Sequence, residues 1–235
     1  MMASSKRTLS FRFCIVAIVA LFSFSFRAEA QSLSFANLPG TSVSFGGGTF
    51  TFLNNSSGYQ FDITAFDAIT NSPSVGLNGY LTNVDSFAIG TITTNFNGGG
   101  FILESAPVLG SATLHITDAS SNDLRGTIQW ISITTVGSGG GSDGTLDLQG
   151  SVNFTNITYS GTNSDLNALA LAGAASDIIT FQFTPGKTID QLAGAGGTSS
   201  YSGVITAVPE PSSWMLVAMG IGSGVFLRGR RQLRR

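Results

Sequence analysis

Few side chains in this chain are suited to chemistry. One histidine, His115, and one cysteine, Cys14, occur in 235 residues. A multi-histidine metal site and a disulfide framework are therefore excluded, because each needs several such residues. Serines are abundant and Asp118 is close to His115, but no G-x-S-x-G segment provides a nucleophile elbow. Since Leu114 and Ile116 point to the other face of an alternating strand, we interpret His115 as a surface or structural residue.

Carboxylates are the only plentiful ionisable groups of the central region. Glycoside hydrolysis needs two of them about 5–10 Å apart, in a cleft with sugar-stacking aromatics. Residues 31–208 contain one glutamate, Glu104, and one tryptophan, Trp130. Trp130 lies in residues 127–133, where both faces of a strand would be apolar, so we expect it in the core. A secreted carbohydrate-active enzyme remains an alternative function.

Asp143 and Asp147 are the best candidates for metal ligands. They follow three glycines at positions 139–141, and two carboxylates on such a loop suit a hard cation such as Ca²⁺. The segment lacks EF-hand spacing and matches the nonapeptide of calcium-binding β-rolls only loosely and once. Aspartate is also common in glycine-rich turns for purely conformational reasons. We therefore predict no metal or other cofactor, and keep a carbohydrate- or calcium-binding adhesin as an alternative.

Charge is distributed unevenly along the chain. Nine of the eleven basic residues lie in the first 27 or the last 8 positions. Between Gln31 and Val208, Arg125 and Lys187 stand against eleven acidic residues, a net charge of −9. Nucleic-acid binding by a basic face is excluded, because no stripe of Lys and Arg exists to neutralise phosphates.

Residues 1–30 have the three parts of a secretory signal peptide. An apolar run over residues 13–26 is followed by Ala28 and Ala30, which form an A-x-A cleavage signal. As a helix this run would extend about 21 Å, short of a hydrocarbon core of about 30 Å, which disfavours a transmembrane anchor. We predict use of the general secretion machinery and cleavage before Gln31, which would also remove Cys14. The basic residues that precede the run are Lys6, Arg7 and Arg12.

Residues 208–235 have a second tripartite pattern. Pro209, Glu210 and Pro211 precede an apolar segment that contains Trp214 and ends at Leu227. A helix over residues 212–227 would extend about 24 Å, so we predict a short transmembrane helix. An arginine cluster after such a helix stays in the cytoplasm, and Trp214 suits the outer interface. The alternative is an ordinary single-pass anchor. The arginines of the predicted cytoplasmic tail, residues 228–235, are Arg228, Arg230, Arg231, Arg234 and Arg235.

A Pro-Glu-Pro motif, a short hydrophobic helix and an arginine cluster, in this order, resemble the PEP-CTERM sorting signal. The resemblance covers residues 209–235 and is marked by Pro209, Glu210 and Pro211. It implies a Gram-negative-type bacterium whose exosortase, a membrane cysteine transpeptidase, recognises the tail and removes it. It also implies transient membrane attachment and export linked to extracellular polysaccharide or a biofilm matrix. It implies nothing about the activity of residues 31–207.

Residues 31–207 have the pattern of β-strands separated by turns. Segments such as 42–45 and 49–52 alternate hydroxyl residues with β-branched or aromatic residues. Turn signals recur about every ten residues, which is typical of sandwiches and barrels. One helix is expected at Ser164–Ala175, with Ser164 as its N-cap. The expected strands cover residues 32–35, 42–45, 49–52, 59–66, 86–96, 100–104, 112–117, 126–136, 145–159, 177–183 and 200–207.

The predicted fold is all-β: an antiparallel β-sandwich or barrel-like extracellular domain over residues 31–207. A signal peptide precedes it, and a sorting signal with a short transmembrane helix follows it. The predicted function is that of an exported, non-catalytic surface or matrix protein. As a precursor it would be in the cell envelope, and after processing at the cell surface or in the matrix.

Overall fold

The structure, a computed structural model, describes residues 31–97, 101–137 and 146–208. No helix in this part of the chain has the length and apolarity needed to cross a membrane. The predicted signal peptide (residues 1–30) and the tail from Pro209 onward lie outside the described residues, so both stay predictions at this point.

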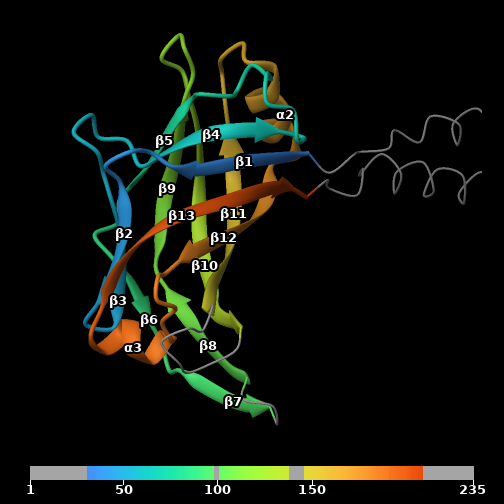
Figure 1. Ribbon diagram of the computed structural model, residues 1–235. Coiled ribbons are helices and arrows are strands. Elements are labelled where there is room, and N and C mark those ends of the chain that lie inside the picture. Colours follow the sequence, from blue (N-terminus) through green and yellow to red (C-terminus); the bar gives the residue numbers. More distant parts are fainter. Residues whose placement is uncertain (1–30, 98–100, 138–145, 209–235) are drawn as a thin grey trace, which may run out of the picture.

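The described residues form thirteen antiparallel strands in one continuous sheet, which confirms the all-β class (Figure 1). Its order is β1-β4-β5-β9-β10-β11-β12-β13-β2-β3-β6-β8-β7. The strands are β1 (Ser32–Asn37), β2 (Ser42–Gly46), β3 (Thr49–Leu53), β4 (Phe61–Phe66), β5 (Asn78–Thr82), β6 (Phe87–Ile89), β7 (Thr93–Asn97), β8 (Phe101–Leu109), β9 (Ser111–Thr117), β10 (Asp123–Gly137), β11 (Leu146–Thr158), β12 (Ala174–Gln182) and β13 (Gly197–Ala207).

This sheet closes on itself twice. β1 pairs with both β4 and β13, so that β1, β4, β5 and β9 complete a ring with β10 to β13. Further along the same long strands, β8 pairs with β10 and β2 pairs with β13. The second ring therefore contains β2, β3, β6 and β8, and shares β10 to β13 with the first. Such closure satisfies backbone hydrogen-bonding groups that an open edge would leave free.

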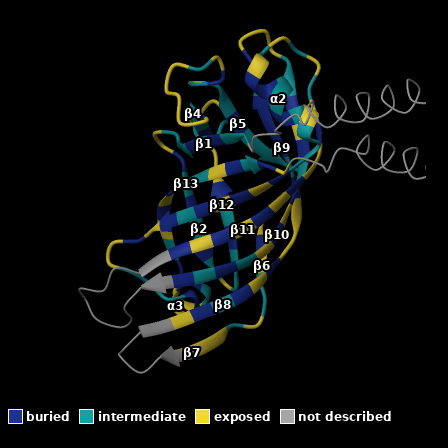
Figure 2. Cartoon of the chain, turned by 90° about the vertical axis from the view of Figure 1, so that its right-hand side faces the viewer, coloured by how far each residue is buried: buried dark blue, intermediate teal, exposed yellow. Residues whose placement is uncertain are grey.

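The core lies inside these rings and is rich in phenylalanine. Figure 2 shows buried and exposed residues alternating along the long strands, as expected when one face is enclosed. Trp130 on β10 is 3% exposed, which confirms the prediction that it is a core residue. Its ring centroid lies 4.8 Å from that of Phe50, 5.5 Å from Phe87 and 6.2 Å from Phe52.

Residues 127–133 do not form one regular strand with two apolar faces, so this prediction is wrong. The register of β10 against β11 shifts between Trp130 and Ser132. At this bulge an extra residue enters one strand, so the alternation of faces restarts. Trp130 and Ile133 are therefore both buried, whereas Ile131 is 49% exposed.

The structure also changes two expectations about helices. α2 (Ser164–Ala172) begins one residue after its N-cap, which is Asn163 and not Ser164. It ends before the predicted Ala175 because Gly173 adopts φ 72°, a left-handed conformation typical of helix ends. A second helix, α3 (Ile189–Gly194), was not predicted; the Thr188 side chain and Gln191 form a capping box at its start.

β5 was not predicted either, and β6 and β7 are two strands where one, over residues 86–96, was expected. The β5 segment is short and contains Gly79, an unfavourable strand residue. A side chain at position 79 would overlap the ring of Phe61. The glycine is therefore explained by packing against β4, which local sequence does not reveal.

Replacing Gly150 by alanine should lower the free energy of unfolding by about 1–3 kcal/mol, because the new methyl group overlaps the Trp130 ring. Urea denaturation followed by circular dichroism would measure this loss. Gly194→Ala is the matched control, since a side chain there meets nothing within 4 Å. Equal stabilities of the two variants would contradict the packing of Trp130 on β11.

Candidate functional site

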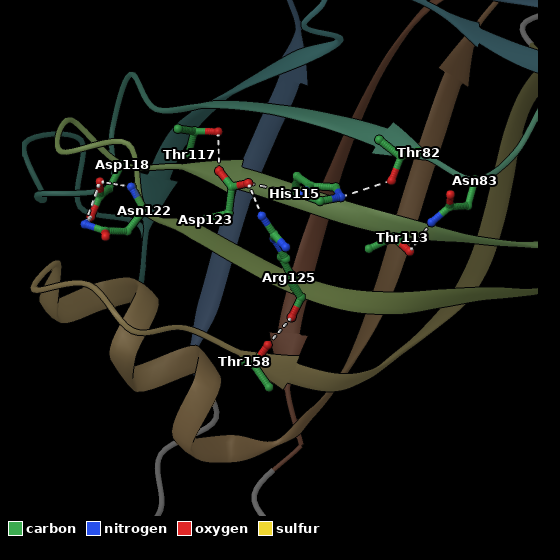
Figure 3. A network of polar contacts seen from close by, with 10 residues as sticks. All are labelled: Thr82, Asn83, Thr113, His115, Thr117, Asp118, Asn122, Asp123, Arg125 and Thr158. Carbon is green, nitrogen blue, oxygen red and sulfur yellow. Dashed lines mark hydrogen bonds and ion pairs between the residues drawn. The ribbon is translucent and has the colours of Figure 1, made fainter.

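His115 on β9 lies at the centre of a polar network that β5, β9 and β10 build together (Figure 3). Its Nδ1 is 3.3 Å from Oδ2 of Asp123, and its Nε2 is 3.0 Å from Oγ1 of Thr82. A carboxylate can only accept, so Nδ1 carries the proton and donates to Asp123. In the neutral imidazole, Nε2 then accepts from the Thr82 hydroxyl.

The imidazole of His115 is covered although it faces away from Leu114 and Ile116. The Tyr80 ring stacks on it with a centroid distance of 4.7 Å and an interplanar angle of 10°. Tyr59 meets Tyr80 edge-on, with centroids 5.9 Å apart. His115 is only 8% exposed. Of the two roles expected from the sequence, surface residue or structural residue, the structure supports the structural one.

Asp123 links the histidine to two further donors. Its Oδ1 accepts from Oγ1 of Thr117 at 2.7 Å, and its Oδ2 lies 3.2 Å from a guanidinium nitrogen of Arg125. Burial raises the pKa of Asp123, but the hydrogen bonds from Thr117, His115 and Arg125 together bring it below its ordinary value. The carboxylate is therefore charged at neutral pH and holds the network together.

Carboxylate, imidazole and hydroxyl occur here in the order of a hydrolytic triad. Such a triad also needs a nucleophile that a substrate can reach and donors for an oxyanion. Tyr80 stacks on this imidazole, and Arg125 shares the carboxylate of Asp123 with it. The internal cavity and the surface groove described below are lined by other residues. The geometry fits a polar brace between three strands better than a site of acyl transfer.

Replacing Asp123 by asparagine should lower the free energy of unfolding by about 1–3 kcal/mol at neutral pH, because Thr117, His115 and Arg125 lose the charged acceptor that they share. A lowered pKa means that the charged form is favoured in the folded state, so this stabilisation disappears as the pH falls below about 4. The difference from wild type should therefore shrink in acid. Denaturation curves of both proteins at neutral pH and below about pH 4 test this. Asp85→Asn, which removes an exposed carboxylate, is the control. A pH-independent difference would contradict it.

The other carboxylates near α2 are used in turns and caps. Asp118 accepts from backbone N–H groups of Ser120 and Asn122. The hydrogen bond from the Tyr159 hydroxyl is the main cause that lowers the pKa of Asp118 to about 2. Asp165, in the first turn of α2, accepts from the backbone N–H of Ser74 at 3.0 Å. These contacts tie α2 and the turns of the barrel together.

Calcium binding by Asp143 and Asp147 stays a prediction. Asp143 lies outside the described residues. Asp147 belongs to β11, paired with Val136 and Gln182, but its side chain is not among those described. Within residues 31–97, 101–137 and 146–208, no three His, Cys, Asp or Glu side chains come together as metal ligands.

Asp177 is a buried carboxyl group that was not among the predicted site residues. It lies on β12 between Val152 and Ile205 of the neighbouring strands and is only 6% exposed. Among the described residues its Oδ1 has no hydrogen-bond partner. Burial raises the pKa of Asp177 to about 7. The signal was present in the sequence, because Asp177 alternates in phase with Ile179, which faces inward.

Asp177 borders a small internal cavity. The cavity has a volume of about 20 Å³ and is otherwise mostly apolar, with Phe35, Phe52 and Tyr201 in its lining. That volume is enough for roughly one water molecule. The cavity is therefore too small for an organic ligand. The buried carboxyl group of Asp177 affects the stability of the fold instead.

A shallow groove lies on the outer face of β1, β4, β12 and β13. Its volume is about 510 Å³. Two partly exposed apolar side chains, Ile178 and Val204, lie opposite each other in register. Hydroxyl groups surround them, and among the residues that the structure describes no charged side chain lines the groove. The hydroxyl residues are Ser34, Thr64, Thr180, Ser202 and Thr206.

The chain leaves the fold at a well-defined point. The Ala207 N–H donates to the carbonyl of Gln31 at 2.7 Å, and the Val208 N–H donates to that of Ala174 at 2.9 Å. Pro209 comes next and has no N–H to donate. The Pro-Glu-Pro segment therefore begins directly where the backbone hydrogen bonding of β13 ends.

A comparison with known protein families gives a match that begins at the same place, the end of β13. A family model described as the PEP-CTERM protein-sorting motif matches residues 207–231, so its first two residues are the last two of the described domain. No curated protein and no solved structure matches the chain. The chain therefore carries a PEP-CTERM protein-sorting motif, joined directly to the last strand of an antiparallel β domain.

Proposed function

We propose that this protein is an exported, non-catalytic component of the cell surface or extracellular matrix, sorted by an exosortase through its PEP-CTERM tail. The observation that carries the proposal is the motif match at residues 207–231. In the precursor, residues 212–227 span the membrane and residues 228–235 lie in the cytoplasm. The exosortase removes this segment, so membrane attachment is transient.

The use of the chemistry-bearing residues favours a non-catalytic role. His115 is stacked and braced, and Asp118 and Asp165 serve turns and a helix terminus. A carbohydrate-active enzyme would need an aromatic platform, and Trp130 is inside the core. The enzymatic alternative therefore receives less support than a structural or binding role.

Association with extracellular polysaccharide is supported by the outer groove. Its uncharged, hydroxyl-lined surface can exchange hydrogen bonds with a neutral polymer, while Ile178 and Val204 provide apolar contact. The domain as a whole is acidic, with a net charge of −9 between Gln31 and Val208. That charge keeps the protein soluble and disfavours acidic polymers.

The test is the intact mass of the protein isolated from its native host, measured separately in membrane and extracellular fractions. The proposal predicts an extracellular species that begins at Gln31 and ends near Pro211. Any additional mass would identify a group attached on processing. A species that still ends at Arg235 and stays in the membrane would overturn exosortase sorting and indicate a permanent anchor.

The adhesin alternative has its own test. If Asp143 and Asp147 bind calcium, millimolar Ca²⁺ should raise the melting temperature of the protein. The double variant Asp143→Ala with Asp147→Ala should abolish that shift. An unchanged melting temperature in the wild type would argue against this alternative.

A further inference from the structure

Both ends of the described domain lie at the same place. β1 begins beside the end of β13 (Figure 1), and Ser32 pairs with Thr206. Ala207 donates to the carbonyl of Gln31, and Val208 to that of Ala174. The tail therefore leaves the domain at this one end of the fold.

The tether between this end and the predicted membrane segment is short. Six Cα–Cα steps separate Val208 from Trp214, which allows at most about 20 Å. A domain of this length is about 40 Å across. While residues 212–227 are in the membrane, as the proposed function requires, the domain cannot turn its other end toward the bilayer.

Three exposed apolar side chains belong to segments that backbone hydrogen bonds link to the exit point. Leu171, in the last turn of α2, is 88% exposed, and Val208 is 50% exposed. Ile69 is 53% exposed and follows a turn in which Asp67 donates its N–H to the carbonyl of Ser32. Leu171 is linked to the same place, because Val208 is bonded to Ala174, just after α2.

Basic side chains of the described domain are not free to bind anionic lipid headgroups at this end. The described domain contains two, and both are engaged: Arg125 with Asp123, and Lys187 with the carbonyl of Gly196 near the start of β13. Attraction to anionic headgroups is therefore weak, and apolar contact remains. Large exposed apolar side chains next to a membrane segment fit the interface between headgroups and acyl chains.

We propose that in the precursor this end of the domain rests on the lipid bilayer, with Leu171, Ile69 and Val208 in the headgroup region. The proposal rests on the proposed sorting function, since the tail brings the domain to the membrane. Removal of the tail then frees an end that had been held against the bilayer.

Site-specific fluorescence in vesicles tests this contact. The chain from Gln31 to Arg235, which lacks the predicted signal peptide and with it Cys14, receives one new cysteine, either Leu171→Cys or Leu103→Cys, labelled with an environment-sensitive dye. Leu103 is the matched control, an exposed leucine at the β7 and β8 end of the fold (Figure 1). The vesicles are phosphatidylcholine with a nitroxide-labelled lipid as quencher, and flotation shows whether the chain is bound to them.

The proposal predicts that lipid quenching removes most of the fluorescence at position 171 and little at position 103. A floating chain with no quenching at either position would overturn the bilayer contact while leaving membrane insertion of the tail intact. A dye at position 171 that lipid does not quench, and whose fluorescence changes only when an exosortase is added, would also overturn the bilayer contact. That result would indicate contact with a protein partner. A chain that does not float would overturn both this proposal and the predicted insertion.

Discussion

Replacing Asp177 by asparagine should raise the free energy of unfolding by about 4 kcal/mol at about pH 8 and change it little at about pH 4. The pKa of this buried carboxyl group is raised to about 7, against about 3.9 in an unfolded chain. Asparagine has nearly the same shape but never carries the charge. The variant should therefore behave like the protein with Asp177 permanently neutral.

The sign of the effect follows from proton binding. Between about pH 4 and pH 7 the folded protein keeps a proton on Asp177 that the unfolded chain releases. Wild-type stability thus falls as the pH rises through this window and stays reduced above it. Below the window both states are protonated, and no difference from the variant is expected.

Urea denaturation of both proteins across this pH range measures the effect. Asp85→Asn is the matched control, because it removes a carboxylate from the exposed surface and should change stability by less than about 0.5 kcal/mol. A gain for Asp177→Asn that is the same at all pH values would contradict the assignment to burial of charge. So would a loss of stability at about pH 8.

Replacing Glu210 by glutamine should leave the precursor uncleaved and in the membrane fraction. The motif match includes Glu210, and it is the only charged residue between Asp190 and Arg228. A recognition site that pairs with a carboxylate loses that interaction when the charge is removed, so we expect a loss of processing of about tenfold or more.

Cell fractionation with intact mass measurement tests this loss. Ser213→Ala changes a residue just after the motif and should be processed like the wild type. Because Glu210 lies beyond the last strand, its replacement should not alter the stability of the domain, which circular dichroism checks. Normal processing of Glu210→Gln would mean that the Pro-Glu-Pro segment is incidental.

Local sequence patterns predicted the position of many strands, but not their pairing or register. Alternation of hydroxyl and aromatic residues located β2 and β3. It could not reveal the bulge in β10, because the shift at Trp130 depends on pairing with β11. Nor could it predict β5, whose glycine is explained by the Phe61 ring.

The polar network around His115 also combines contacts that are close in the sequence with contacts that only the fold brings together. Asp123 is eight residues from His115 in the chain, but Thr82 is thirty-three residues away and comes from another strand. Asp177 differs, because its inward position follows from the alternation of β12. Only burial by the surrounding strands turns that position into a raised pKa.

The sequence by itself determined the sorting motif, because such a signal is contiguous and its parts are recognised in linear order. It also determined the β class, since side-chain alternation is a property of each strand alone. Tertiary structure decided the ring closure, the brace around His115 and the common exit of both chain ends. These depend on contacts between residues far apart in the chain, as the pairing of Ser32 with Thr206 illustrates.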